Sequence, residues 1–303
     1  MLTDKQRLQM LTCPRGMVDM VLDTDAYNEI DDQFALSYAL FSGERLNLKA
    51  VYAAPFFNER SNDPADGMEK SYQEIQHLFR LAGRDAPAFR GAPGYLADEK
   101  TPVDSPAARD LCARAMGYSP EKPLYVAAIG AITNIASALL LQPDIADRIV
   151  IVWLGGHSIH WPDNREFNCQ QDVAAARVVF QSGAPLVILP CMGVVSACTT
   201  TGPELAYWLR GKGALCDYLC DHTMEAAEEY ARGKVWSRVI WDITAIGWLM
   251  NEKGNLMQDT LIPTPIPEYD HHYSFDDTRP LCRYVYHINR DALLQDLFSR
   301  ITA

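Results

Sequence analysis

The residues best suited to chemistry lie in one short stretch, V-L-D-T-D-A-Y-N-E-I-D-D-Q at 21–33. It holds five acidic side chains, Asp23, Asp25, Glu29, Asp31 and Asp32. Asp23 and Asp25 lie two apart at the end of an apolar run at 17–22, so on an extended strand end both would face the same way. Asp31 and Asp32 lie where a helix is expected to begin, and its dipole favours negative charge. The stretch therefore predicts up to four carboxylates aimed at one point.

Converging carboxylates need a partner, because without one each raises the pKa of its neighbours. The donors are hard oxygens with no nearby His or Cys, which favours Ca²⁺ or Mg²⁺ over zinc. The alternative interpretation is that Asp31 and Asp32 only cap a helix and the other acids are solvated in a loop. A phosphatase of the haloacid dehalogenase type also begins with a strand ending in D-x-D. That group usually has Thr or Val where this chain has Tyr27, and its G-D-x-x-x-D motif is missing here.

Four further segments follow in order along the chain. They are A-A-I-G-A-I-T-N-I-A at 127–136, W-L-G-G at 153–156, R-E-F-N at 165–168 and W-D-I-T-A at 241–245. Together with the opening acids they resemble the nucleoside hydrolases of the inosine–uridine-preferring family. The resemblance runs from about residue 17 to about residue 250.

The resemblance implies a calcium site and a general base. Asp25, Asp32 and Asp242 match carboxylate ligands of a tightly bound Ca²⁺, and the backbone carbonyl of Ile129 matches a main-chain ligand. Asp31 matches the general base that takes a proton from water bound to calcium. Asp23 matches the first acid of the motif, which supports the metal site and the ribose pocket.

The resemblance also implies the substrate. Glu166 and Asn168 match residues that hold ribose hydroxyls, and Asn58 lies where the family often has another ribose-contacting Asn. The implied reaction is calcium-dependent hydrolysis of the N-glycosidic bond of a ribonucleoside, or a close analogue, to free base and ribose. Family members are dimers or tetramers, so a homo-oligomer is expected.

Some of these segments have a structural explanation as well. Asn134 in I-T-N-I-A is expected to cap the helix that follows it. Asp242 is harder to explain in this way, because it lies in the apolar run I-W-D-I-T-A-I-G-W-L, where an unpartnered charge is costly to bury.

Two departures from the family pattern concern the substrate. The usual opening has three residues between the second and third Asp, but here A-Y-N-E-I makes five. Asn28 and Glu29 are therefore either additional groups facing the site or part of a loop bulge. Many members carry His before the late Asp, where this chain has Trp241, whose face can stack on a nucleobase. His222, Tyr230 and the segment at 270–272 are other candidates for the proton donor.

The elements that must position these residues alternate between strand and helix. Strands are expected at 17–22, 46–54, 124–129, 149–154 and 185–189, and helices at 31–41, 67–82, 132–141 and 172–181. A Pro/Gly-rich connection covers 85–106, and 203–250 is helical in character. The tail from 256 has an extended stretch, a strand at 282–288 and a last helix from Arg290. This pattern predicts an α/β fold with an open, mostly parallel sheet, helices on both faces and a helical and mixed C-terminal part. We expect residues 1–303 to form a single domain.

Composition excludes several functions. The net charge is -12 and no Lys/Arg cluster stands out, which argues against a nucleic-acid partner. The N-terminus lacks a signal-peptide core and no apolar run is long enough to span a bilayer, so a cytoplasmic protein is expected. The eight cysteines form no C-x-x-C pair and are expected to be reduced thiols.

Two rival functions remain open from the sequence. One is the Mg²⁺-dependent phosphohydrolase described above. The other is a catalytically weakened nucleoside-binding protein, which the missing His makes conceivable.

Overall fold

The computed structural model describes residues 2–303, and Met1 lies outside the described residues. Within that range the main sheet has eight strands in the order β3-β2-β1-β4-β5-β6-β12-β9. All neighbours in it are parallel except β12 and β9. The strands are β1 (Val18–Thr24), β2 (Leu46–Ala53), β3 (Ala88–Arg90), β4 (Leu124–Ala128), β5 (Ile149–Leu154), β6 (Leu186–Leu189), β9 (Met257–Pro263) and β12 (Leu281–Ile288). The predicted open, mostly parallel sheet is confirmed.

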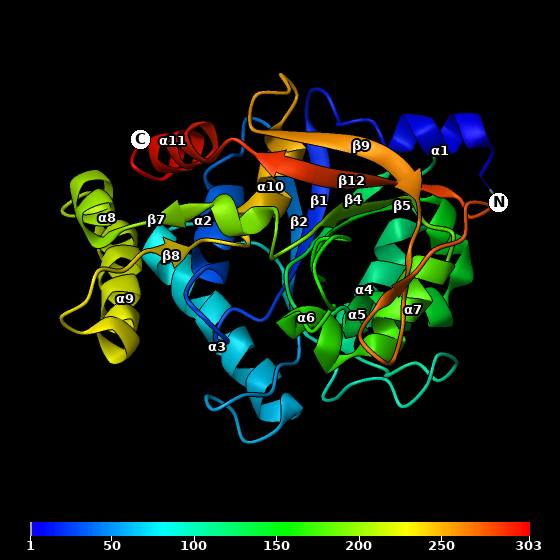
Figure 1. Cartoon of the computed structure of the whole chain (residues 1–303), viewed down its shortest axis with the longest axis horizontal. Helices are drawn as coiled ribbons and strands as arrows, with labels where there is room; N and C mark the ends of the chain where they lie inside the picture. Colours follow the sequence, from blue (N-terminus) through cyan, green and yellow to red (C-terminus); the bar gives the residue numbers. More distant parts are fainter. Residues whose placement is uncertain (1) are drawn as a thin grey trace.

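Helices cover both faces of this sheet (Figure 1). One face packs against α4 (Pro106–Ala115), α5 (Thr133–Leu141) and α7 (Val173–Gln181). The other packs against α2 (Asp32–Leu40), α3 (Pro64–Ala82), α10 (Ile243–Met250) and α11 (Arg290–Ile301). The alternation of strand side chains explains the division, because Met20 and Leu22 of β1 belong to one buried cluster and Val21 to the other.

The remaining elements lie around this core. They are the helices α1 (Asp4–Met10), α6 (Phe167–Gln171), α8 (Gly202–Leu209) and α9 (Ala214–Ala231), and two small sheets that pair β7 (Thr199–Thr200) with β8 (Arg238–Val239) and β10 (Ile266–Pro267) with β11 (Tyr273–Ser274). No helix within residues 2–303 is both long and apolar enough to cross a membrane.

The structure differs from the sequence prediction in several elements. The connection at 85–106 contains the edge strand β3, and the helical region at 203–250 is divided by β8. The extended stretch after residue 256 is β9, which pairs with β12. The prediction missed α1 and α4. Short edge strands are hard to predict because their pairing comes from distant residues and not from a local pattern.

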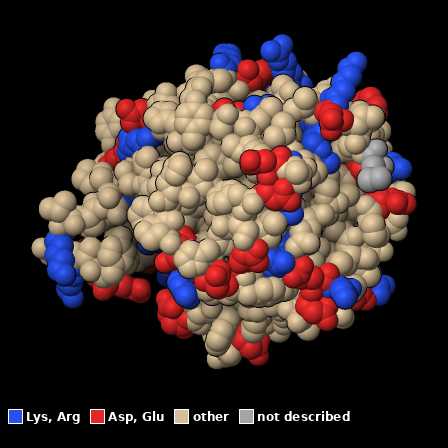
Figure 2. All heavy atoms as spheres, turned by 45° about the vertical axis from the view of Figure 1, so that its right-hand side comes forward, with Lys and Arg blue, Asp and Glu red and all other residues tan. Residues whose placement is uncertain are grey.

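Acidic and basic side chains are mixed on the face displayed in Figure 2, and no large basic area gathers there. This agrees with the acidic composition, because a nucleic-acid backbone is bound by clustered Lys and Arg.

Candidate active site

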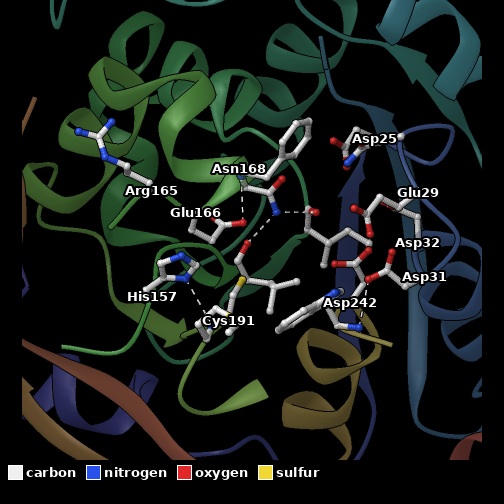
Figure 3. A pocket seen from close by; sticks show the side chains of 16 residues that line it. Asp25, Glu29, Asp31, Asp32, His157, Arg165, Glu166, Asn168, Cys191 and Asp242 are labelled. Carbon is white, nitrogen blue, oxygen red and sulfur yellow. Dashed lines mark hydrogen bonds between the residues drawn. The ribbon is translucent and has the colours of Figure 1, made fainter. Parts of the chain in front are cut away.

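The carboxyl ends of β1, β4, β5 and β6 meet at one edge of the sheet and carry a pocket just beyond it (Figure 3). Asp25, Ile129, Leu154 and Cys191 lie at or just beyond these strand ends and line the pocket. This is where a parallel sheet is expected to hold its ligand. The other lining residues are Asn28, Glu29, Asp31, Asp32, His157, Arg165, Glu166, Phe167, Asn168, Met192, Trp241 and Asp242.

Three buried carboxylates form the centre of the pocket. Oxygens of Asp31, Asp32 and Asp242 lie within 4.8 Å of one another. Asp31 precedes α2, Asp32 is its first residue, and Asp242 directly precedes α10. Because α10 packs on α2, residues 210 positions apart are brought together (Figure 3).

Hydrogen bonds fix the direction of these side chains. Thr24 Oγ1 donates to Asp32 Oδ1, and the Trp241 backbone N–H donates to Asp31 Oδ2 at 3.0 Å. The Asp31 side chain makes no capping hydrogen bond to α2. The capping alternative is therefore wrong for Asp31, whose carboxylate is turned towards the pocket.

Asp25 lines the same pocket but is not part of the group of three. It is 1% exposed, and its Oδ2 has no hydrogen-bond partner within residues 2–303. A Cβ at Gly130 would lie 2.9 Å from Asp25 Oδ1, so only glycine leaves room for this carboxylate. Asp25 therefore presents an uncommitted oxygen beside the carboxylate group.

Asp23 lies behind the pocket and is not among the lining residues. Its Oδ1 accepts a hydrogen bond of 2.8 Å from Asn134 Nδ2. The prediction that Asn134 caps its helix is wrong: Ile132 is the capping residue of α5, and the Asn134 side chain also contacts Ala53 O and the Ala92 backbone N–H. The amide of Asn134 thus ties β1, β2 and the loop after β3 together beneath the site.

We expect Asn134→Ala to destabilise the protein by about 3 kcal/mol, since a buried donor or acceptor left without a partner costs about 1–3 kcal/mol. Asn134→Asp should be worse, because it brings a second carboxylate next to Asp23 Oδ1. Chemical denaturation monitored by circular dichroism measures both. A loss below about 1 kcal/mol for both variants would show that this amide does not hold the strands.

Burial raises the pKa of each aspartic acid at this site. It brings the pKa of Asp23 to about 7, with the charge of Asp32 adding to the effect, and that of Asp32 to about 6. Burial and neighbouring carboxylates raise the pKa values of Asp25, Asp31 and Asp242 well above the ordinary range. Such a group is unfavourable when ionised unless a cation neutralises it. The all-oxygen donor set and the free Asp25 oxygen fit a hard divalent cation.

The opposite wall of the pocket is built around Asn168. Its Nδ2 donates to the carbonyls of Ile129 at 3.0 Å and Leu154 at 3.1 Å, which leaves Oδ1 to accept from a ligand. Ile129 O keeps a second lone pair, so it can still contact a cation.

Glu166 lies in the connection that follows β5, directly before α6. It is the N-terminal cap of α6, and its two oxygens accept hydrogen bonds from the backbone N–H groups of Gly156, Asn168 and Cys169. Burial raises the pKa of Glu166, against the effect of these three donors. Glu166 therefore shapes the wall as well as lining it.

Asn28 and Glu29, the residues that distinguish the opening loop, both line the pocket. Asn28 Oδ1 accepts a hydrogen bond of 2.7 Å from Asn58 Nδ2, and Asn58 is itself not a lining residue. The Glu29 carboxylate pairs with Arg238 of β8. Glu29 thus connects the opening loop to the segment that supplies Trp241 and Asp242.

Sequence reasoning missed His157, Arg165, Phe167, Cys191 and Met192. His157 directly follows W-L-G-G at the end of β5, a position at which a polar residue could have been noticed. Its Nδ1 accepts from the Met192 N–H at 3.4 Å. The proton donors suggested from the sequence, His222, Tyr230 and the segment at 270–272, are not among the lining residues.

Comparison with known proteins agrees with this architecture. The profile of the inosine-uridine preferring nucleoside hydrolase family matches residues 20–293. The chain belongs to this family.

Individual relatives are more distant. The pyrimidine-specific ribonucleoside hydrolase RihA of Citrobacter koseri is 31% identical over 183 residues, which cover 52% of this chain and 55% of that protein. RihB of Shigella flexneri is 33% identical over 147 residues, 46% of this chain and 45% of that protein. The chain thus matches about half the length of these curated relatives. The structure of a purine-preferring ribonucleoside hydrolase from Gardnerella vaginalis shares the fold, with a TM-score of 0.75 and 22% identity over 94% of this chain and 98% of that one.

Proposed function

We propose that this protein hydrolyses the N-glycosidic bond of a ribonucleoside or close analogue, with a bound Ca²⁺ ion, to give free base and ribose. The observation that carries the proposal is the meeting of Asp31, Asp32 and Asp242 in a buried pocket beside the uncommitted oxygen of Asp25. Family membership supports the same reaction, as do the names of the relatives, which are ribonucleoside hydrolases.

Asp32 and Asp242 would hold the cation, with the Ile129 carbonyl as a further ligand. The family resemblance makes Asp25 the third carboxylate ligand and Asp31 the base. The geometry favours the exchange of these two roles, because Asp31 belongs to the close group and Asp25 has the free oxygen. We adopt the assignment that the geometry favours. When bound, such a cation lowers the pKa of water and orients hydroxyl groups.

The protein's own side chains would do the rest. Asp25 Oδ2 accepts the proton of the attacking water, a step that a carboxylate of raised pKa performs well. Asn168 Oδ1 accepts a hydrogen bond from a ribose hydroxyl, and Glu166 and Asn28 lie beside the sugar. Trp241 offers a face for the base. Attack by water from the side opposite the base inverts the configuration at the anomeric carbon.

The test is release of reducing sugar from a panel of ribonucleosides that includes uridine, cytidine and inosine. Protein stripped of metal with a chelator should release none, and Ca²⁺ should restore activity better than Mg²⁺. Release of inorganic phosphate from phosphate esters with Mg²⁺ would support the phosphohydrolase instead. Binding of nucleosides without ribose release under any metal would support the binding protein.

The homodimer or homotetramer and the cytoplasmic location expected from the sequence also remain predictions. Light scattering during gel filtration measures the first of these directly.

A further inference from the structure

A second cavity lies at the edge of the sheet opposite the candidate active site. It is found where β6 and β12 begin and β9 ends, and α1 lies beside it (Figure 1). Its volume is about 220 Å³, and it shares no lining residue with the first pocket. Arg7 and Arg279 line it, together with Gln181 and Thr264, and no acidic side chain does. The cavity therefore has a positive lining in a chain that is acidic as a whole.

Backbone carbonyls around the cavity hold both guanidinium groups in place. Arg7 Nη2 donates to Gly183 O at 2.7 Å. Arg279 Nη2 donates to Phe180 O at 2.6 Å, and its Nε donates to Thr264 O at 2.8 Å. The three residues that supply these carbonyls all line the cavity. The two arginines, one from α1 and one from the loop before β12, are thus both fixed at the wall of the same cavity.

The positive charge of these two side chains is not neutralised by an acid. Within residues 2–303 neither Arg7 nor Arg279 forms an ion pair with an acidic side chain. Burial lowers the pKa of Arg7, against the charges of Asp147 and Asp4, which lie further away. The carboxyl end of α7 contributes about half a negative charge, so an excess of positive charge remains. A partly buried cation in this situation is stabilised by a bound anion.

Most N–H groups of the two side chains remain available to a ligand. Each guanidinium has five N–H groups, and the three bonds to carbonyls use only three of them. None of the nitrogens of Arg7 or Arg279 is both buried and without a partner, so the remaining groups are open to solvent. Arginine binds phosphate oxygens through pairs of parallel hydrogen bonds. The cavity is smaller than the roughly 300 Å³ of a pocket for a larger organic molecule, so a phosphate group fits it better than a whole nucleoside.

We propose that Arg7 and Arg279 form a binding site for a phosphate group at the amino end of β6, separate from the candidate active site. The occupant is inorganic phosphate or the phosphate of a small monoester, because both offer the same oxygens to the two guanidinium groups. The site joins α1, the connection from α7 to β6 and the loop before β12. A bound phosphate group would therefore hold these three segments together. The proposal does not depend on the reaction at the first pocket.

The first test is isothermal titration calorimetry of the full chain with inorganic phosphate and, separately, with methyl phosphate. Both titrations are made at constant ionic strength, without added calcium, at about pH 8, where phosphate is mostly a dianion. We expect one phosphate group to bind per chain. Binding of inorganic phosphate alone would identify the free ion as the occupant, and binding of methyl phosphate at least as tightly would identify an ester. No binding of either compound would overturn the proposal.

Substitution of an arginine measures its contribution. Arg279→Gln should weaken phosphate binding by about tenfold or more, because a hydrogen bond between two charged groups is lost. Arg80→Gln, at an exposed residue of α3 outside the cavity, is the control and should leave the affinity unchanged. Equal affinity in Arg279→Gln and the wild type would contradict the proposal.

A second variant keeps both arginines and the carbonyls they hold. Gln181→Glu places a carboxylate at the cavity, where it competes with phosphate, and should weaken binding by about tenfold or more. Gln73→Glu is the matched control, because both glutamines are exposed and each donates a hydrogen bond to a Glu. It should leave phosphate affinity unchanged. Equal affinities in the two variants would count against the proposal.

A variant of the first pocket shows which cavity holds the ion. Asp32→Asn should leave phosphate affinity unchanged, because Asp32 does not line the second cavity. Crystals soaked in phosphate should show it between Arg7 and Arg279. Loss of phosphate binding in Asp32→Asn, with none in Gln181→Glu, would place the ion at the candidate active site and overturn the proposal.

Discussion

Asp25→Asn is expected to lower kcat by about 10²- to 10⁴-fold while the protein keeps its divalent ion, since that is the range contributed by a general base. The amide has nearly the shape of the carboxylate and fits beside Gly130, but it cannot accept the proton of water. Bound calcium is measured by isothermal titration calorimetry, and kcat by the reducing-sugar assay.

Asp31→Asn is expected to behave in the opposite way, with calcium affinity falling by about tenfold or more because a ligand of the close group is lost. Its turnover at saturating calcium should fall less than that of Asp25→Asn. Asp277→Asn, at an exposed site away from the pocket, serves as the control. If Asp31→Asn retains calcium and loses turnover while Asp25→Asn loses calcium, the roles are those implied by the family resemblance and not those favoured by the geometry.

The second large effect is the dependence of stability on calcium and pH. A ligand at about 1,000 times its Kd stabilises the folded state by about 4 kcal/mol. We expect the difference in melting temperature between calcium-loaded and metal-free protein to be small at pH 5 and to grow towards pH 8. Differential scanning calorimetry measures it in both states at each pH.

The direction follows from the pKa shifts. In the metal-free protein the pKa of Asp32 is raised from 3.8 to about 6 and that of Asp23 to about 7. An acid with a raised pKa favours folding while it is protonated, so this contribution is complete below the unfolded pKa and is lost as pH rises through the folded one. The metal-free protein should therefore lose stability between about pH 4 and pH 7. Calcium competes with these protons and opposes the loss.

Asp32→Asn is the matched variant for this measurement. It removes one raised pKa and one ligand, so both the loss of stability with pH and the gain from calcium should shrink. A difference in melting temperature that is constant from pH 5 to pH 8 in the wild type would show that the metal does not compete with protons at these carboxylates.

Much of the fold could be predicted because its central strands are buried on both faces. Such strands read as short apolar runs, and the alternation with helices implies a parallel sheet. β3 and β9 were harder to predict, since both lie at the edges of the sheet and take their conformation from a partner strand. The division of residues 203–250 by β8 depends on its pairing with β7, which no local pattern reveals.

The candidate site was predictable where the chemistry was concentrated in sequence. Asp242 and all the opening acids except Asp23 do line one pocket, but the sequence could not tell which three carboxylates come closest. The prediction for Asn134 was wrong, because a residue that caps a helix and a residue whose side chain bonds to Asp23 on a neighbouring strand can have the same local sequence. Cys191 was missed because a single residue after a strand carries no pattern of its own, whereas His157 could be recognised only by its place directly after W-L-G-G.

The distance along the chain between Asp32 and Asp242 has a consequence for the order of folding. The three carboxylates cannot meet until β1 has joined the sheet and α10 has docked on α2, which is one of the later long-range contacts the chain can make. A cation held there cannot guide the early stages of folding. It would stabilise the folded state after folding is complete, and so slow unfolding much more than it speeds folding. The opening loop and the segment before α10 would then separate only after the ion has left.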